Sequence, residues 1–83
     1  MYLEIVTPVK TVYSDEVLSV TVPGTKGSFG MLKNHAPIVS TLATGEIKIT
    51  DKNNQKIVFK VSGGVVENTH NNVVILADSI EKM

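Results

Sequence analysis

The stretch from Val22 to Pro37 reads V-P-G-T-K-G-S-F-G-M-L-K-N-H-A-P and interrupts a regular alternation of apolar and polar residues. It contains two of the three prolines in the chain, three of the six glycines and one of the two histidines. Glycine, proline and small polar residues favour turns, and loops on rigid scaffolds carry binding and catalytic groups. We therefore interpret this stretch as a long loop between strands and as the first place to look for function.

The residues before this stretch predict a strand that begins at Glu16. Leu18, Val20 and Val22 are spaced by two, so we expect them to share one face of that strand. Pro23-Gly24 should then end it as the central pair of a type II turn, because proline fixes φ and glycine tolerates a positive φ.

The rest of the chain shows the same alternation between turn-forming residues. Further short strands are predicted over Tyr2–Val6, Val12–Tyr13, Ile38–Leu42, Glu46–Thr50, Lys56–Val61, Val65–Glu67 and Val73–Leu76. A turn at Ser14-Asp15 should close the second of them, and the last is an unbroken apolar run, typical of a strand buried on both faces. Together these segments predict an all-β fold, a flattened antiparallel β-sandwich or barrel of about ten short strands.

A chain of 83 residues is expected to form one domain. We place this domain at residues 1–78 and a short tail at 79–83. Asp78-Ser79-Ile80-Glu81, at the boundary between them, resembles the capping box at the start of a helix. The remaining residues make about one turn, which is too short for a stable helix.

The composition excludes several classes of function. Eight lysines balance eight acidic residues, and the chain has neither arginine nor cysteine. Nucleic-acid binding proteins usually carry a basic excess with arginine, so nucleic acid is not an expected partner. Without cysteine there are no disulfides or thiolate metal sites. A signal peptide and a run of about 18 apolar residues are both missing, so we expect a cytoplasmic domain without direct membrane insertion.

No arrangement of residues predicts a catalytic, cofactor-binding or metal site. His35 could act as a general base, but no motif supplies an orienting group or a nucleophile, so a small hydrolase is the weakest hypothesis. The spacing of Gly24, Gly27 and Gly30 does not match a phosphate-binding loop. Two distant histidines match no metal-ligand spacing, and His70 lies in a polar turn. The pattern indicates an interaction module, in which Phe29 and Met31 either close one end of the core or face a partner.

A second class of function is a free-standing β-sandwich that binds a small ligand or a glycan. Such a module needs a concave apolar site with a few convergent polar groups. The sequence offers only four aromatic residues for it, Tyr2, Tyr13, Phe29 and Phe59.

Three motifs, in this order, resemble the epsilon subunit of F-type ATP synthases. They are V-P-G-T-K-G-S-F-G-M-L-K-N-H-A-P-I-V from Val22, V-S-G-G-V-V-E from Val61 and V-V-I-L-A-D from Val73. The opening L-E-I-V-T-P fits as well, so the resemblance covers Leu3 to Asp78. It implies a flattened ten-stranded β-sandwich that binds the gamma subunit and the c ring as a non-catalytic part of the rotor. It also implies a peripheral location on the cytoplasmic face of the bacterial inner membrane, within the F1 sector.

The resemblance assigns two interfaces by motif position. The expected c-ring interface consists of Lys26, Gly27, Ser28 and Phe29. The expected gamma-subunit interface consists of His35, Ala36, Pro37 and Ser40. In the family an acidic residue is common at the position of Ser28, and Pro-Gly usually stands where this chain has Lys33-Asn34. Asparagine tolerates a left-handed backbone at small cost, so we still expect a turn at Asn34.

The resemblance also bears on the tail. Typical members continue after L-A-D into a C-terminal helical hairpin that can restrain rotation and in some members binds ATP. This sequence does not contain that hairpin, which fits either a shortened gene or a truncation. If the sequence is the whole protein, we expect no inhibitory arm, no cofactor and no nucleotide bound by this chain.

Overall fold

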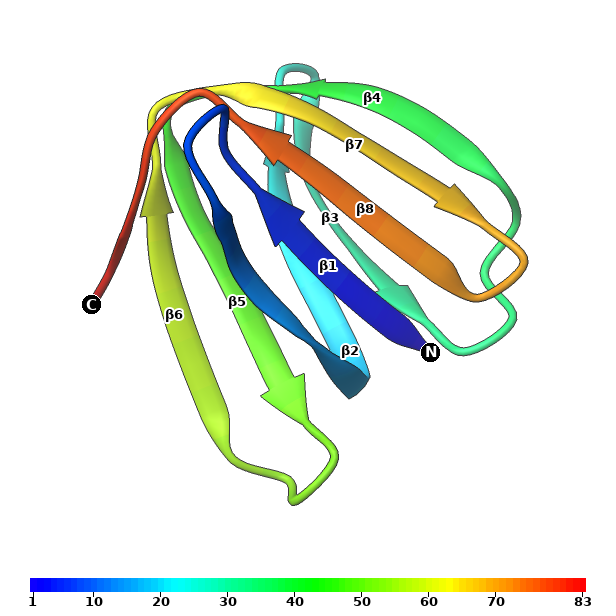
Figure 1. Ribbon diagram of the computed structural model, residues 1–83. Coiled ribbons are helices and arrows are strands. Elements are labelled where there is room, and N and C mark those ends of the chain that lie inside the picture. Colours follow the sequence, from blue (N-terminus) through cyan, green and yellow to red (C-terminus); the bar gives the residue numbers. More distant parts are fainter.

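The computed structural model describes all residues from Met1 to Met83, and every regular element is a β-strand (Figure 1). The strands are β1 (Tyr2–Val6), β2 (Thr11–Gly24), β3 (Gly27–Leu32), β4 (Ile38–Leu42), β5 (Gly45–Asp51), β6 (Lys56–Val61), β7 (Gly64–Thr69), β8 (Asn72–Ala77) and β9 (Ile80–Lys82). The predicted all-β class is confirmed, with nine strands where about ten were expected. None of the chain forms a helix that is long and apolar enough to cross a membrane.

The strands form two layers that share β2. The second half of β2 pairs with β3 on one side and β5 on the other, and β6 and β9 continue this sheet, which we call layer A. The first half of β2 pairs with β1, and β8, β7 and β4 follow in layer B. The predicted sandwich is therefore confirmed. One neighbouring pair, β1 with β8, is parallel, and the other pairs are antiparallel.

The course of β2 corrects two predictions, because this strand is continuous and contains a β-bulge. β2 is continuous from Thr11 to Gly24, so the turn expected at Ser14-Asp15 does not form. The register with β5 shifts between Val17 and Ser19, which reverses the alternation of faces. Val17 is therefore buried, whereas Leu18 is 50% exposed and does not share the face of Val20 and Val22 as expected. Such bulges bend a strand, and this one lies where β2 passes from layer B to layer A.

The core fills the space between the two layers. It contains fifteen buried apolar residues, namely Leu3, Ile5, Val17, Val20, Val22, Met31, Leu42, Ile47, Ile49, Phe59, Val61, Val66, Val73, Ile75 and Ala77. β8 contributes three of them, but Leu76 on the same strand is 53% exposed. The prediction that the Val73–Leu76 run is buried on both faces is therefore wrong, because the outer face of layer B has no third layer over it.

The central stretch is more regular than the sequence suggested. β3 lies inside the predicted loop and pairs with β2 from Ser19↔Leu32 to Gly24↔Gly27. Pro23 and Gly24 therefore end β2 instead of forming the expected type II turn, and the hairpin turns at Thr25 and Lys26. The period-2 signal was present, since Met31 is buried and its neighbours Gly30 and Leu32 are exposed.

The tail forms a strand where the start of a helix was expected. β9 pairs with the free edge of β6, with Ile80 opposite Val61 and Lys82 opposite Phe59. Ile80 also packs against the core. A single helical turn would gain neither this apolar contact nor the strand hydrogen bonds, so the extended conformation is favoured.

Candidate functional site

The eight residues predicted for the two interfaces do not form one site. Lys26 to Phe29 lie at and just after the turn between β2 and β3, which we call the hairpin tip (Gly24–Ser28). His35, Ala36 and Pro37 lie in the connection between β3 and β4, which we call the His35 corner (Lys33–Pro37). β3 separates them by about 17 Å, at roughly 3.3 Å per residue. The central stretch thus presents two separate surfaces at opposite ends of one strand (Figure 1).

The hairpin tip is fastened to the end of β4. The Thr25 N–H donates a hydrogen bond to Thr41 O at 3.0 Å, and the two threonine hydroxyls lie 2.7 Å apart. Lys26, Gly27 and Ser28 are exposed, and Gly27 has a φ of 128°, which side chains rarely allow. The tip therefore has one cation, Lys26, on a backbone that is held in place.

Phe29 closes the end of the core behind the tip. Its side chain is half-buried and packs against the core cluster. A Cβ atom at Gly24 would lie only 2.9 Å from Cε1 of the Phe29 ring, so the ring covers this glycine directly. Of the two roles considered for Phe29, the structural one is confirmed, and contact with a partner stays a prediction.

The His35 corner is a tight turn with a fixed imidazole. The His35 N–H donates to Leu32 O at 3.1 Å, and Asn34 has a φ of 66°, as position i+2 of a type II turn requires. Asn34 thus takes the conformation that glycine adopts most easily. His35 Nδ1 lies 2.8 Å from Ala36 O, and because a carbonyl oxygen only accepts, Nδ1 carries the proton. Nε2 takes no part in this bond, and the two residues that follow, Ala36 and Pro37, are exposed.

A pair of asparagines connects this corner to the turn between β7 and β8. The Asn34 N–H donates to Asn71 Oδ1 at 2.6 Å, and Asn71 Nδ2 donates to Asn34 Oδ1 at 3.1 Å. We call this the Asn34–Asn71 pair. The sequence alone does not connect Asn71 to this corner, because the two asparagines are 37 positions apart.

Ser40 does not face the same way as the rest of its predicted interface. It lies opposite Val66 on β7, whose side chain is buried, so Ser40 is on the inner face of layer B. It is half-buried, and its hydroxyl donates to Thr41 O at 3.1 Å. The adjacent Val39 is on the outer face and 67% exposed, and Leu32 is 65% exposed. These two apolar side chains flank the His35 corner and are further candidates for partner contact.

The corner has no catalytic arrangement around His35. The side-chain hydrogen-bond partner of His35 is a backbone carbonyl, whereas a general base is normally oriented by a carboxylate and placed beside a nucleophile. The structure has no group of three or more His, Cys, Asp or Glu side chains that could hold a metal ion.

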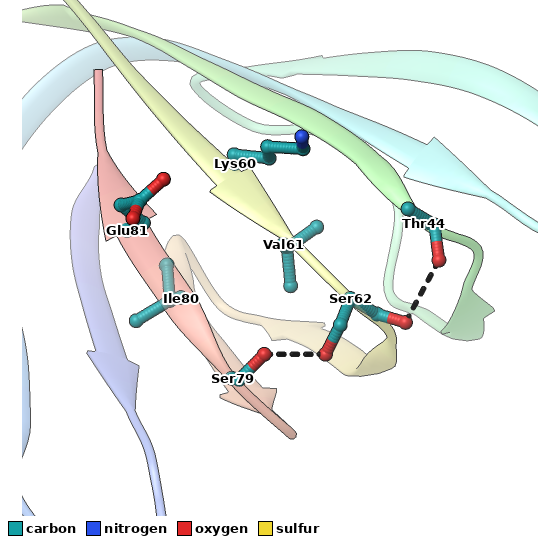
Figure 2. Close-up of a pocket in the computed structure, with 7 residues that line it drawn as sticks. All are labelled: Thr44, Lys60, Val61, Ser62, Ser79, Ile80 and Glu81. Carbon is teal, nitrogen blue, oxygen red and sulfur yellow. Dashed lines mark hydrogen bonds between the residues drawn. The ribbon is translucent and has the colours of Figure 1, made fainter.

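One hollow lies at the far edge of layer A, between β6 and β9 (Figure 2). It has a volume of about 340 Å³ and is lined by Thr44, Lys60, Val61, Ser62, Ser79, Ile80 and Glu81. The Ser79 hydroxyl donates to Ser62 Oγ at 2.7 Å, and Thr44 Oγ1 donates to Ser62 O at 3.0 Å. The lining contains no aromatic side chain and its hydroxyls are already paired, which does not favour a glycan or small-ligand site.

Comparison with known proteins identifies the family. The family described as "ATP synthase, Delta/Epsilon chain, beta-sandwich domain" matches residues 1–83. The chain belongs to this family. The resemblance to the epsilon subunit, first inferred from three motifs, is thereby confirmed.

Several relatives share this delta/epsilon-type sandwich. The "ATP synthase epsilon chain" of Campylobacter curvus is 46% identical over 78 residues, which are 94% of this chain and 60% of that protein. A chain in the structure of the Euglena gracilis mitochondrial ATP synthase, described as OSCP/F1/c-ring in rotational state 1, superposes with a TM-score of 0.90 at 21% identity. The match covers 96% of this chain and 51% of that one.

A second solved structure has the same fold. A chain in the Tetrahymena thermophila mitochondrial ATP synthase, described as central stalk/c-ring, gives a TM-score of 0.81 at 22% identity, over 98% of this chain and 65% of that chain. The delta/epsilon-type sandwich described here thus spans about half to two thirds of the length of these relatives. The structures, at these identities, show a shared fold.

Proposed function

We propose that this domain acts as a non-catalytic rotor element of an F-type ATP synthase, linking the gamma subunit to the c ring. The observation that carries this proposal is the family match over all residues, 1–83. The relative from Campylobacter curvus is an ATP synthase epsilon chain, and the two structural neighbours come from assemblies described as F1/c-ring and central stalk/c-ring. ATP synthesis and hydrolysis would then take place on other subunits.

The geometry supports a role in which force passes through the domain. The hairpin tip and the His35 corner are at opposite ends of β3, and each is fastened to a second element, β4 or the β7–β8 turn. Fifty backbone–backbone hydrogen bonds and a packed core connect these points. Because such interiors transmit strain with little compression, a load applied at one end would reach the other.

We assign the hairpin tip to the c ring and the His35 corner to the gamma subunit. At the tip, Lys26 offers one exposed cation, and the exposed Ser28 adds no charge. At the corner, Ala36 and Pro37 offer an exposed apolar surface directly after His35, whose ring is held through Nδ1. Ser40 would contribute through the backbone position of β4, since its side chain faces inward.

This assignment also gives the location. A domain that contacts a membrane-embedded c ring through an exposed turn would be peripheral to the membrane, in the F1 sector. We place it on the cytoplasmic face of a bacterial inner membrane, in line with the bacterial origin of the Campylobacter relative.

The experiment compares two variants of the intact chain, each of which should lose one partner and keep the other. Lys26→Glu should weaken binding to isolated c rings and leave binding to the gamma subunit unchanged, whereas His35→Ala should do the reverse. Lys56→Glu is the control for the same change of charge, because Lys56 lies at the start of β6, away from the tip. Surface plasmon resonance with each immobilised partner measures both affinities. If the wild-type chain binds neither partner, the proposed function is wrong; if both variants lose both partners equally, the assignment of the two surfaces is wrong.

A further inference from the structure

The turn at the His35 corner places an asparagine where the backbone favours glycine. Asn34 has a φ of 66°, in the left-handed region, which asparagine enters at a lower cost than most residues but less easily than glycine. Outside the strands, this corner makes a single backbone–backbone hydrogen bond, from His35 N to Leu32 O. The turn by itself therefore has little to hold it in one shape.

The Asn34–Asn71 pair adds two hydrogen bonds that hold the turn in one conformation. Asn71 accepts the Asn34 N–H at 2.6 Å and donates back to Asn34 Oδ1 at 3.1 Å. Asn71 is itself well placed to hold another segment, because His70 and Asn71 have φ values of 50° and 64°, as in the rigid type I′ turn of a two-residue hairpin. The β7–β8 hairpin thus acts as a fixed support from which one side chain reaches the corner.

The pair orders a surface of exposed apolar side chains around His35. The segment it holds carries the fixed His35 ring and the exposed Ala36 and Pro37. Leu32 and Val39, at 65% and 67% exposure, lie on either side of it. Exposed apolar groups next to a fixed polar group are typical of the centre of a protein interface.

We propose that Asn71 is a positioning residue for docking of the gamma subunit. It holds the His35 corner in the shape that the partner binds, so that the loop does not have to be ordered at the moment of association. Ordering a loop on binding lowers affinity, and a pre-formed loop avoids this cost. The inference rests on the proposed function for its partner, while the ordering of the corner by Asn71 stands on the contacts alone.

The test compares two substitutions of left-handed asparagines by glycine. Asn71→Gly keeps a backbone that tolerates the turn but removes both hydrogen bonds to Asn34. The matched control is Asn54→Gly in the β5–β6 turn, where Asn54 has a φ of 63° and contributes only its N–H, to Asp51 O. Two quantities are measured on the intact chain: amide hydrogen exchange at Asn34 and affinity for the gamma subunit by isothermal titration calorimetry.

We expect Asn71→Gly to speed exchange at Asn34 and to weaken gamma binding about three- to tenfold, as the loss of one to two hydrogen bonds predicts. Asn54→Gly should leave both unchanged. Unchanged exchange at Asn34 in Asn71→Gly would overturn the ordering of the corner. Faster exchange with wild-type affinity would overturn its role in docking. If the wild-type chain does not bind gamma, the proposed function fails and the docking role with it, whereas the exchange result still decides the ordering.

Discussion

Asn68 is the only polar residue in the buried interior. It lies on the inner face of β7, opposite Ile38 and Val73, and is 1% exposed. Neither its amide nitrogen nor its amide oxygen has a hydrogen-bond partner. A buried polar group without a partner costs about 1–3 kcal/mol of stability, so this side chain works against the fold that contains it.

Replacing Asn68 by leucine, which has a similar size, should therefore stabilise the protein. We expect Asn68→Leu to raise the free energy of unfolding by about 1–3 kcal/mol, because it removes the unpaired amide and adds apolar contact. Urea denaturation measures the change. Thr69→Leu, on the exposed face of the same strand, is the control and should have little effect. A loss of stability in Asn68→Leu would show that the amide makes a favourable contact.

Within a single strand, the bulge in β2 decides which side chains are buried and therefore contribute to stability. Val17 is 3% exposed and Leu18 is 50% exposed, although the plain alternation of the sequence predicts the opposite. We expect Val17→Ala to lower the free energy of unfolding by about 2 kcal/mol, and Leu18→Ala by less than about 1 kcal/mol. Thermal unfolding of the two variants measures this difference. Equal losses, or a larger loss for Leu18→Ala, would contradict the bulged register.

The same strands show how far the sequence could lead. The period-2 alternation predicts both strands of the β5–β6 hairpin, and they pair as antiparallel neighbours. The bulge at Leu18 could not be predicted, because the sequence pattern on either side of the extra residue does not show where it is inserted. The sequence does not predict β3, because its glycines are typical of turns, although Phe29 and Met31 alternate with exposed neighbours as in a strand.

The candidate site also has features that the sequence predicts and features that it does not. The left-handed turn at Asn34 was expected from the residue type and is confirmed by its φ of 66°. Its partner Asn71 and the inward direction of Ser40 depend on strand register, which links residues far apart in the sequence. Local patterns therefore predicted the turn, while the contacts that hold it needed the fold.

For the molecule as a whole, the carboxylate of Asp15 makes the free energy of unfolding depend on pH. The Glu16 N–H and Lys52 Nζ donate to Asp15 Oδ1 at 2.8 and 3.2 Å, and these bonds hold the pKa of Asp15 below its ordinary value. Because the pKa is lower in the folded state, this stabilisation is present above the unfolded-state pKa, near 4. It is lost as the pH falls through the folded-state pKa.

Asp15→Asn should therefore flatten the acid side of the stability curve. Between pH 7 and pH 3 the variant should lose less stability than the wild type, since asparagine has no charge to lose. Urea midpoints at several pH values measure this, with Glu81→Gln on β9 as a control carboxylate. If the two curves are parallel, the contacts of Asp15 do not contribute to acid stability.

A domain that joins two parts of a rotor should restore coupling to an ATP synthase that lacks its epsilon chain. Membranes with an F-type ATP synthase depleted of its epsilon chain are supplied with the intact protein, and ATP-driven proton pumping is followed by quenching of a pH-sensitive dye. A domain that links gamma to the c ring should restore pumping, and Lys26→Glu combined with His35→Ala should restore much less. Failure of the wild-type protein to bind the depleted complex, or binding without any recovery of pumping, would contradict the account.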